Sequence, residues 1–176
     1  MQIIDAHVHP FVTPEQRMGR HSGFVTDMDY FVEDLQRAGI THCCGSVIER
    51  LNVSSWEDVR RLNDQALEIG ERYPDFYTPG FHIHPAFPVE SCEEIERMSA
   101  KGVKLIGELV WYMMGWEQYA DPRLREAFEL AAQKGSSLAL TCLGIVLGFK
   151  LVEMLFRTAW PQAPESKEEK GGPSCR

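Results

Sequence analysis

The chain has 176 residues and a formal net charge of −8, with 44% hydrophobic and 25% charged residues. This composition is typical of a soluble globular protein and excludes disordered, collagen-like and disulfide-scaffold classes. The acidic balance argues against nucleic acid or an anionic membrane surface as a partner, and no apolar run reaches the roughly 18 residues that span a bilayer. The N-terminus has no signal-peptide pattern, so we expect a cytoplasmic protein with reduced cysteines in its core, at Cys43, Cys44 and Cys142.

The chain predicts strands and helices in alternation. Apolar runs rich in β-branched residues predict strands at Gln2–His9, Ile40–Ile48, Phe76–His84, Val103–Val110 and Ser137–Cys142. Apolar residues at helical spacing predict the intervening helices at 27–39, 56–73, 89–100 and 121–134. Asp27 is the expected N-cap and Gly39 the expected C′ residue of the first helix, while Ser91 and Glu94 have capping-box spacing in the third. Such alternation favours a parallel sheet built of βαβ units.

The last part of the chain has a different character. Residues 144–160 are apolar nearly all round and predict one helix, whereas 161–176 combine prolines, glycines and charges with little to bury. We therefore expect one domain over residues 1–160, followed by a disordered tail over 161–176.

His7 and His9 are the residues that point most directly to chemistry. Residues i and i+2 of a strand share a face, so the two imidazoles at the end of the first strand converge on one point, as a divalent metal requires. Asp5 lies on the same face, one pleat deeper. The alternative is that the two histidines are ordinary polar residues at the end of a strand, before the loop that follows Pro10, and bind no metal.

Two motifs carry a resemblance to a known family. Asp-Ala-His-Val-His-Pro at 5–10 lies on the first strand of a βα series, and Gly-Glu at 107–108 ends the fourth. In this order they resemble the amidohydrolase superfamily, especially the amidohydrolase-related proteins and their TatD-type relatives, over about residues 1–143. The resemblance implies a (β/α)₈ TIM-barrel-like fold with its site at the C-terminal face. It implies that His7 and His9 bind a divalent metal and that Glu108 binds or bridges it, with Zn preferred, Mn or Mg as alternatives, and one or two ions.

The chain also departs from the family pattern. The family expects a histidine at the end of strand five, where this chain has Thr141, and no histidine follows His84. The family's later strand-six histidine and strand-eight aspartate have no counterpart, and 176 residues are fewer than the roughly 250 of a complete barrel. We therefore expect a β/α barrel truncated to about five βα units, without the aspartate that would serve as general base.

Residues near the strand ends are candidates for substrate contacts. His82 and His84 form a second His-x-His pair, and we assign His84 to the substrate or metal surroundings, with a hydrogen-bonded core histidine as an equal alternative. Arg50, in the second loop, suits a carboxylate or phosphate substrate. Trp111 begins an aromatic and methionine cluster that would wall an apolar pocket or contact a neighbouring chain. The first loop holds three further polar candidates, which an ordinary solvated surface would also explain, at Arg17, Arg20 and His21.

Three functional hypotheses follow from these residues. The first is a metal-dependent hydrolase that attacks an amide, ester or phosphoester with metal-activated water, or a related metal-dependent decarboxylase of aromatic acids. The second is a truncated, non-catalytic half-barrel that binds metal or assembles with another chain through its open edge, with the segment after Gly144 produced by a frame change. The third is an open, doubly wound binding module. In a barrel, His7 and His9 share the interior with Glu108, whereas in an open sheet they would face helices.

Overall fold

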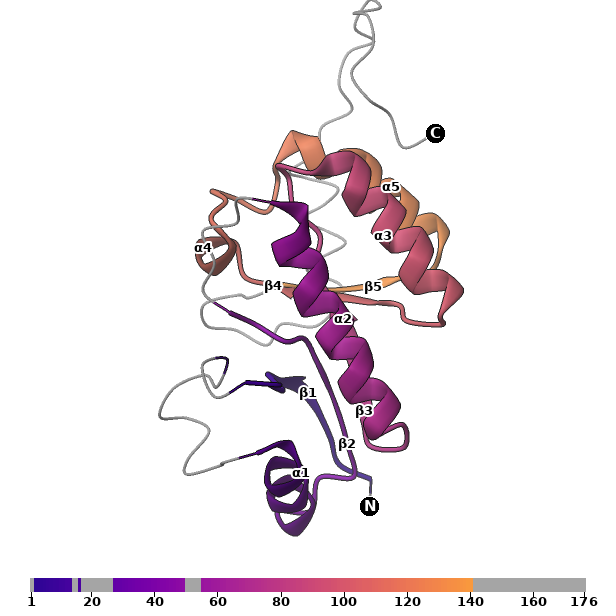
Figure 1. Ribbon diagram of the computed structural model, residues 1–176. Helices are drawn as coiled ribbons and strands as arrows, with labels where there is room; N and C mark the ends of the chain where they lie inside the picture. Colours follow the sequence, from indigo (N-terminus) through magenta and orange to yellow (C-terminus); the bar gives the residue numbers. More distant parts are fainter. Residues whose placement is uncertain (1, 14–15, 17–26, 50–54, 141–176) are drawn as a thin grey trace, which may run out of the picture.

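The structure is a computed structural model that describes residues 2–13, 16, 27–49 and 55–140 (Figure 1). Several predictions from the sequence lie outside these residues: those on Arg17, Arg20, His21, Arg50, Thr141 and Cys142, and those on the helix at 144–160 and the tail at 161–176.

In the described part of the chain, five parallel strands form one sheet in the order β1-β2-β3-β4-β5. Their bounds are Ile4–Val8 for β1, His42–Gly45 for β2, Tyr77–Phe81 for β3, Leu105–Leu109 for β4 and Ser137–Leu140 for β5. Each of these strands lies beside the one that precedes it in the chain, and the order does not reverse between β1 and β5. A doubly wound sheet needs such a reversal, whereas a barrel is wound in one direction. The strands therefore form a curled half-barrel, and the doubly wound alternative is wrong.

Helices connect the successive strands. They are α1 at Met28–Arg37, α2 at Trp56–Arg72, α3 at Pro88–Ala100, the single turn α4 at Trp111–Met114, the 3₁₀ turn η3 at Pro122–Leu124 and α5 at Arg125–Gln133. Helix α2 packs on β3, and α3 packs beside α5 (Figure 1). The βα repeat predicted from the hydrophobic spacing is thus present from β1 to β5.

Capping contacts confirm one prediction and overturn another. The Asp27 side chain accepts a hydrogen bond from the Tyr30 backbone N–H at 2.8 Å, and Gly39 has the positive φ of +90° expected after a helix end. Helix α3 begins at Pro88 with Phe87 as its N-cap residue, so the predicted capping box of Ser91 and Glu94 is wrong. Both side chains are buried and bond to other elements instead.

One face of the sheet packs on the helices and carries the core. Pro79 of β3 faces α2, since a Cβ added at Gly70 of that helix would lie 3.1 Å from the proline Cγ. Cys43 is buried on the same face as Tyr77, its register partner on β3. On β1, by contrast, His7 is exposed, with 62% of its side chain accessible, so it does not face the helix layer. This is the arrangement that the barrel prediction requires of the first strand.

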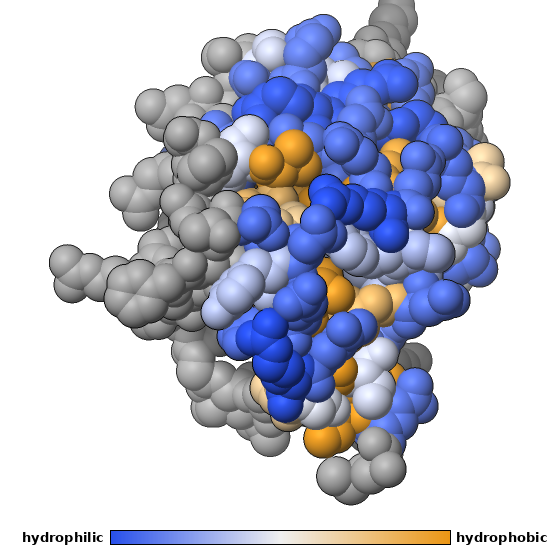
Figure 2. Space-filling view, turned by 60° about the horizontal axis from the view of Figure 1, so that its bottom comes forward, coloured by the Kyte–Doolittle hydropathy of each residue, from blue (hydrophilic) through white to orange (hydrophobic). Residues whose placement is uncertain are grey.

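The face of the molecule drawn in Figure 2 is mainly hydrophilic. In the view of Figure 2 the apolar side chains form separate small patches rather than one broad face. Among the residues that the structure describes, the exposed large apolar ones are Ile3, Ile4, Val12 and Tyr30. Among the described residues, no helix has both the length and the apolar character needed to cross a bilayer.

Candidate metal centre

The structure brings His7, His9 and Glu108 together at the C-terminal ends of β1 and β4. The Glu108 Oε2 atom lies 2.7 Å from Nε2 of His7 and 3.2 Å from Nε2 of His9, and the two imidazole Nε2 atoms are 3.0 Å apart. These residues form the group of potential metal ligands found among the described residues. The three positions singled out from the sequence thus meet at one point, although β1 and β4 are not neighbours in the sheet.

Local irregularities in both strands aim these side chains. The register of β1 shifts between Asp5 and Val8, and the Asp5 carboxylate accepts a hydrogen bond from the His7 backbone N–H at 3.0 Å. Asp5 therefore supports the strand backbone and is not a member of the three-residue cluster. The His7 and His9 side chains still point to the same side, as their i, i+2 spacing predicts.

A second register shift, between Ile106 and Leu109, aims Glu108. Ile106 pairs in register with Phe81, which shares the helix-facing side of β3 with Pro79, so strict alternation would turn Glu108 toward the helices. Gly107 makes the change possible: its φ is +110°, and a Cβ there would lie 2.3 Å from the Ala139 carbonyl oxygen of β5. Only glycine meets both conditions.

The tautomer of His9 is set by the backbone. Its Nδ1 atom lies 3.3 Å from the Ser46 carbonyl oxygen, just beyond the end of β2. A carbonyl oxygen can only accept a hydrogen bond, so Nδ1 carries a proton, and it is Nε2 that presents a lone pair whenever the ring is neutral. Such a contact behind a ligating imidazole is typical of protein metal sites. His9 is also well shielded, with 16% of its side chain exposed.

The chemistry of the three donor atoms fits a divalent cation. His9 Nε2 and the Glu108 carboxylate lie 3.2 Å apart, and a divalent cation between them would attract both the nitrogen lone pair and the carboxylate. Ligand atoms about 2.1 Å from one ion lie about 3.0 Å apart in octahedral and about 3.4 Å apart in tetrahedral coordination. The three donor atoms are separated by 2.7, 3.0 and 3.2 Å, which is close to the spacing expected for ligands of one octahedrally coordinated ion. Two imidazoles and a carboxylate are acceptable ligands for Zn²⁺ and for Mn²⁺.

His82 lies next to this cluster and is fully enclosed. Its side chain donates from Nε2 to the Val47 carbonyl oxygen at 2.8 Å, while its buried Nδ1 has no hydrogen-bond partner among the described residues. Burial lowers the pKa of His82 to about 4. The ring is therefore neutral at pH 7 and adds no positive charge beside the cation site.

His84, predicted as a substrate contact, has both ring nitrogens bonded to the backbone. Nδ1 accepts from the Ala86 N–H at 3.1 Å, and Nε2 donates to the Met114 carbonyl oxygen at 2.9 Å. Burial lowers the pKa of His84, and its ring packs against Phe87 and Trp116. This arrangement corresponds to the core histidine weighed as the alternative, and a role toward substrate would need these bonds to open.

The aromatic and methionine cluster after β4 packs into the chain's own core. Met113, Met114 and Trp116 are buried, and Trp111 at the start of α4 is half-buried against the core. These side chains therefore cover the end of the half-barrel itself, which the sequence alone could not distinguish from covering a substrate or a neighbouring chain. Trp111 still lies three residues after Glu108, close enough along the chain to border the cluster.

Described residues that sequence reasoning missed include Ser46, which contacts His9, and Val47 and Asn63, which contact the neighbouring His82. The first two act through backbone carbonyls, which any residue carries, so no residue type could have marked them. Asn63 bonds the His82 backbone from 19 positions away. The signal that the sequence offered for Asn63 was its polar side chain on the apolar side of the predicted second helix.

Comparisons with known proteins identify the fold. No family model matches the chain, and no curated protein matches its sequence. The solved structure of 5-carboxyvanillate decarboxylase from Novosphingobium aromaticivorans, with bound manganese and 3-methoxy-4-hydroxy-5-nitrobenzoic acid, is 17% identical over 61% of this chain and 32% of that one, with a TM-score of 0.50. The structure of a 5-carboxyvanillate decarboxylase from Sphingomonas paucimobilis is 16% identical over 69% of this chain and 38% of that one, also with a TM-score of 0.50.

These similarities agree with the strand order and show that the chain has a partial β/α-barrel fold. The matched part spans about a third of each decarboxylase, 32% and 38% of their chains.

Proposed function

We propose that the chain belongs to the amidohydrolase superfamily and carries part of the site of a metal-dependent decarboxylase of aromatic acids. The observation that carries the proposal is the convergence of the His7, His9 and Glu108 donor atoms at the C-terminal ends of the strands. Barrel enzymes keep their chemistry at that end. The fold shared with two decarboxylases favours decarboxylation over the hydrolysis that the sequence placed first.

In this reaction the bond between the aromatic ring carbon and the carboxylate carbon breaks, carbon dioxide leaves, and the ring carbon keeps the electron pair and takes up a proton. A divalent ion held by His7, His9 and Glu108 would supply a Lewis acid that attracts the oxygens of the substrate. The chain's own residues would set the position of the ion. Ser46 orients the His9 ring. His82 is neutral at pH 7, so no positive charge from its ring offsets the negative charge of Glu108. Arg50 is proposed to bind the substrate carboxylate and Trp111 to contact its ring.

Hydrolysis of an amide, ester or phosphoester is the second candidate. It needs a water activated near the same three ligands and a general base to take its proton. We rank hydrolysis below decarboxylation because both solved structures of similar fold are decarboxylases.

A substrate panel separates these candidates. The purified chain, loaded with Mn²⁺ or Zn²⁺, is incubated with hydroxylated benzoates and, separately, with ester, lactone and phosphoester substrates. We expect metal-dependent release of carbon dioxide from a benzoate and its loss in the His7→Ala/His9→Ala variant. Hydrolysis without carbon dioxide release would favour the second candidate. No turnover of either class by the metal-loaded chain would overturn the enzyme proposal and leave a metal-binding half-barrel.

We also propose that the chain associates with a second copy of itself through an open sheet edge. In the described sheet, β1 and β5 each pair on one side, and Ile4 of β1 is 54% exposed. An exposed apolar edge strand is a template for pairing with another chain. Light scattering after size-exclusion chromatography should give the mass of a dimer for the wild type and of a monomer for Ile4→Lys, and equal masses would contradict this partner.

A further inference from the structure

A buried asparagine holds the backbone of His82 at the end of β3. Asn63 of α2 accepts the His82 backbone N–H on Oδ1 at 2.7 Å and donates from Nδ2 to the His82 carbonyl oxygen at 3.0 Å. β3 ends at Phe81, so the amide takes the place of a neighbouring strand for the next residue. Asn63 is fully buried, which makes both bonds hard to replace with water.

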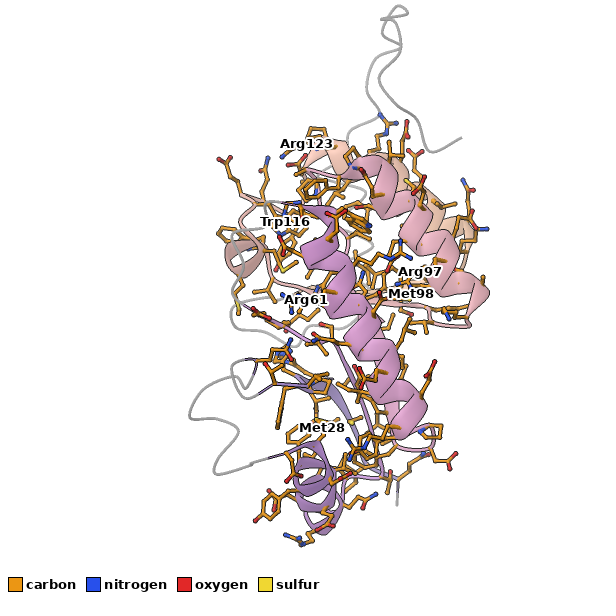
Figure 3. All side chains as sticks on the ribbon, in the orientation of Figure 1. Met28, Arg61, Arg97, Met98, Trp116 and Arg123 are labelled. Atoms are coloured by element: carbon orange, nitrogen blue, oxygen red, sulfur yellow. The ribbon has the colours of Figure 1, made fainter. Side chains whose placement is uncertain are left out.

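A buried carboxylate fixes the orientation of that amide. Glu94 of α3 accepts from Asn63 Nδ2 at 2.9 Å on Oε1. Arg97 neutralises Glu94 through a bidentate pair, with Nε at 2.7 Å and Nη2 at 2.6 Å. Its Nη1 atom lies 2.8 Å from Asp64 of α2, so Arg97 links the two helices (Figure 3). Because Glu94 accepts from Nδ2, the amide can present only Oδ1 to the His82 N–H.

His82 in turn holds the end of β2. Its Nε2–H donates to the Val47 carbonyl oxygen, while His9 donates to the carbonyl oxygen of Ser46, the preceding residue. Successive carbonyls of an extended chain point in opposite directions. Here the Ser46 carbonyl meets the His9 ring on the β1 side, and the Val47 carbonyl meets the His82 ring on the β3 side. Ser46 and Val47 are fully buried. The two rings thus fix the backbone of β2 just past the last residue of its ladder.

We propose that Asn63, Glu94 and Arg97 are positioning residues that act through His82 to hold the Ser46 carbonyl where it fixes the tautomer and orientation of His9. Metal affinity at the site is then set partly from the α2–α3 interface. This inference rests on the proposed metal function of His9. It adds a continuous set of contacts, Arg97 to Glu94 to Asn63 to His82 to the end of β2, that reaches the ligand from the opposite side of the sheet.

The chain contains a matched control for this set. Ser91 of α3 holds the backbone of His84 in a similar way, accepting its N–H at 2.9 Å and donating to its carbonyl at 3.1 Å. Ser91 is equally buried, but the His84 ring bonds Met114 and not the end of β2. Loss of Ser91 should therefore cost stability without affecting His9.

The experiment compares His82→Leu, His82→Gln, Arg97→Gln and Ser91→Ala in the full chain. Leucine removes the donor to Val47, whereas the glutamine amide can replace the Nε2–H. Nitrogen-15 NMR of the metal-free protein reports the His9 tautomer, titration calorimetry with Mn²⁺ reports affinity, and circular dichroism reports the melting temperature. Arg97 is the first residue of this set of contacts and is partly exposed. We therefore expect Arg97→Gln to fold, so that it tests the contribution of Arg97 in a folded protein.

We expect a single Nδ1–H tautomer of His9 in the wild type, His82→Gln and Ser91→Ala. His82→Leu should give a tautomer mixture and bind Mn²⁺ at least about tenfold more weakly, with a smaller loss, of a few fold, in Arg97→Gln. The inference is overturned if His82→Leu and Arg97→Gln lower only the melting temperature, as Ser91→Ala does. If the wild type binds no Mn²⁺, the proposed function fails, whereas the tautomer still decides the positioning role.

Discussion

Substituting Gly45 tests how closely β1 and β2 approach beside the metal ligands. Gly45 pairs in register with Val8, which lies between His7 and His9. A Cβ at Gly45 would lie 1.8 Å from the Val8 carbonyl oxygen, and real Cβ atoms keep at least 3.0 Å. Because the contact is with backbone, no rotamer relieves it, and the two strands must separate by about 1.2 Å, the difference between those two distances.

The expected cost of Gly45→Ala follows from that separation. Overpacking of a tight interior costs about 1–3 kcal/mol, and the strained ladder bond between β1 and β2 adds about 1 kcal/mol. A loss of about 3 kcal/mol corresponds to a fall in melting temperature of roughly 6–12 °C for a domain of this size. Metal–ligand distances tolerate about 0.2 Å, so a shift of this size should weaken Mn²⁺ binding at least about tenfold.

Thermal unfolding and Mn²⁺ titration of Gly45→Ala and of Gly70→Ala provide the test. A Cβ at Gly70 of α2 would meet only the Pro79 side chain, at 3.1 Å, and alanine is the better helix former by about 1 kcal/mol. We expect the melting temperature of Gly70→Ala to stay within about 3 °C of the wild type. An unchanged melting temperature and Mn²⁺ affinity in Gly45→Ala would refute the close approach of β1 and β2.

Three further predictions concern titrating groups. The pKa of His82 is lowered to about 4 from 6.5, so its stabilising contribution is complete above pH 6.5 and falls by about 3 kcal/mol as the pH drops to 4; urea unfolding at several pH values should show this slope in the wild type and a weaker one in His82→Gln. The Arg123 side chain lowers the pKa of Asp121, so Arg123→Ala should raise that pKa in a carbon-13 NMR titration, and an unshifted midpoint would contradict the ion pair. Burial raises the pKa of Cys43 to about 12, so at pH 8 iodoacetamide should label it slowly in the native chain and quickly in urea, and equal rates would contradict its burial.

The order of the strands and helices was predictable because each apolar run is bounded by a turn residue and each long helix has clear periodicity. The single turn α4 at Trp111–Met114 was not predicted, since four residues show no helical period. Ser91 and Glu94 matched a local capping pattern, but burial gives both residues tertiary partners, the His84 backbone and Asn63. Where a side chain is buried, its tertiary partners decide its hydrogen bonds, and a local capping pattern in the sequence is a weaker guide.

The candidate site was predictable in its members and not in its support. His7 and His9 share a strand face by their spacing alone, and the meeting with Glu108 follows from β1 and β4 being strands of one curled sheet. Gly107 permits the register shift that turns Glu108 inward, but a glycine within a strand does not by itself specify that shift. Partners such as Val47 for His82 lie 35 positions away and act through the backbone, so they emerge only from the packed structure.

The metal content of the purified chain tests the central claim most directly. The wild type, Glu108→Gln and His7→Ala/His9→Ala are dialysed against Mn²⁺ or Zn²⁺, passed through a desalting column and measured by plasma mass spectrometry. We predict at least one retained ion per wild-type chain, less in Glu108→Gln and none in the double variant, with circular dichroism showing that all three are folded. Equal metal content in the wild type and the double variant would contradict the assignment of His7, His9 and Glu108 as a metal centre.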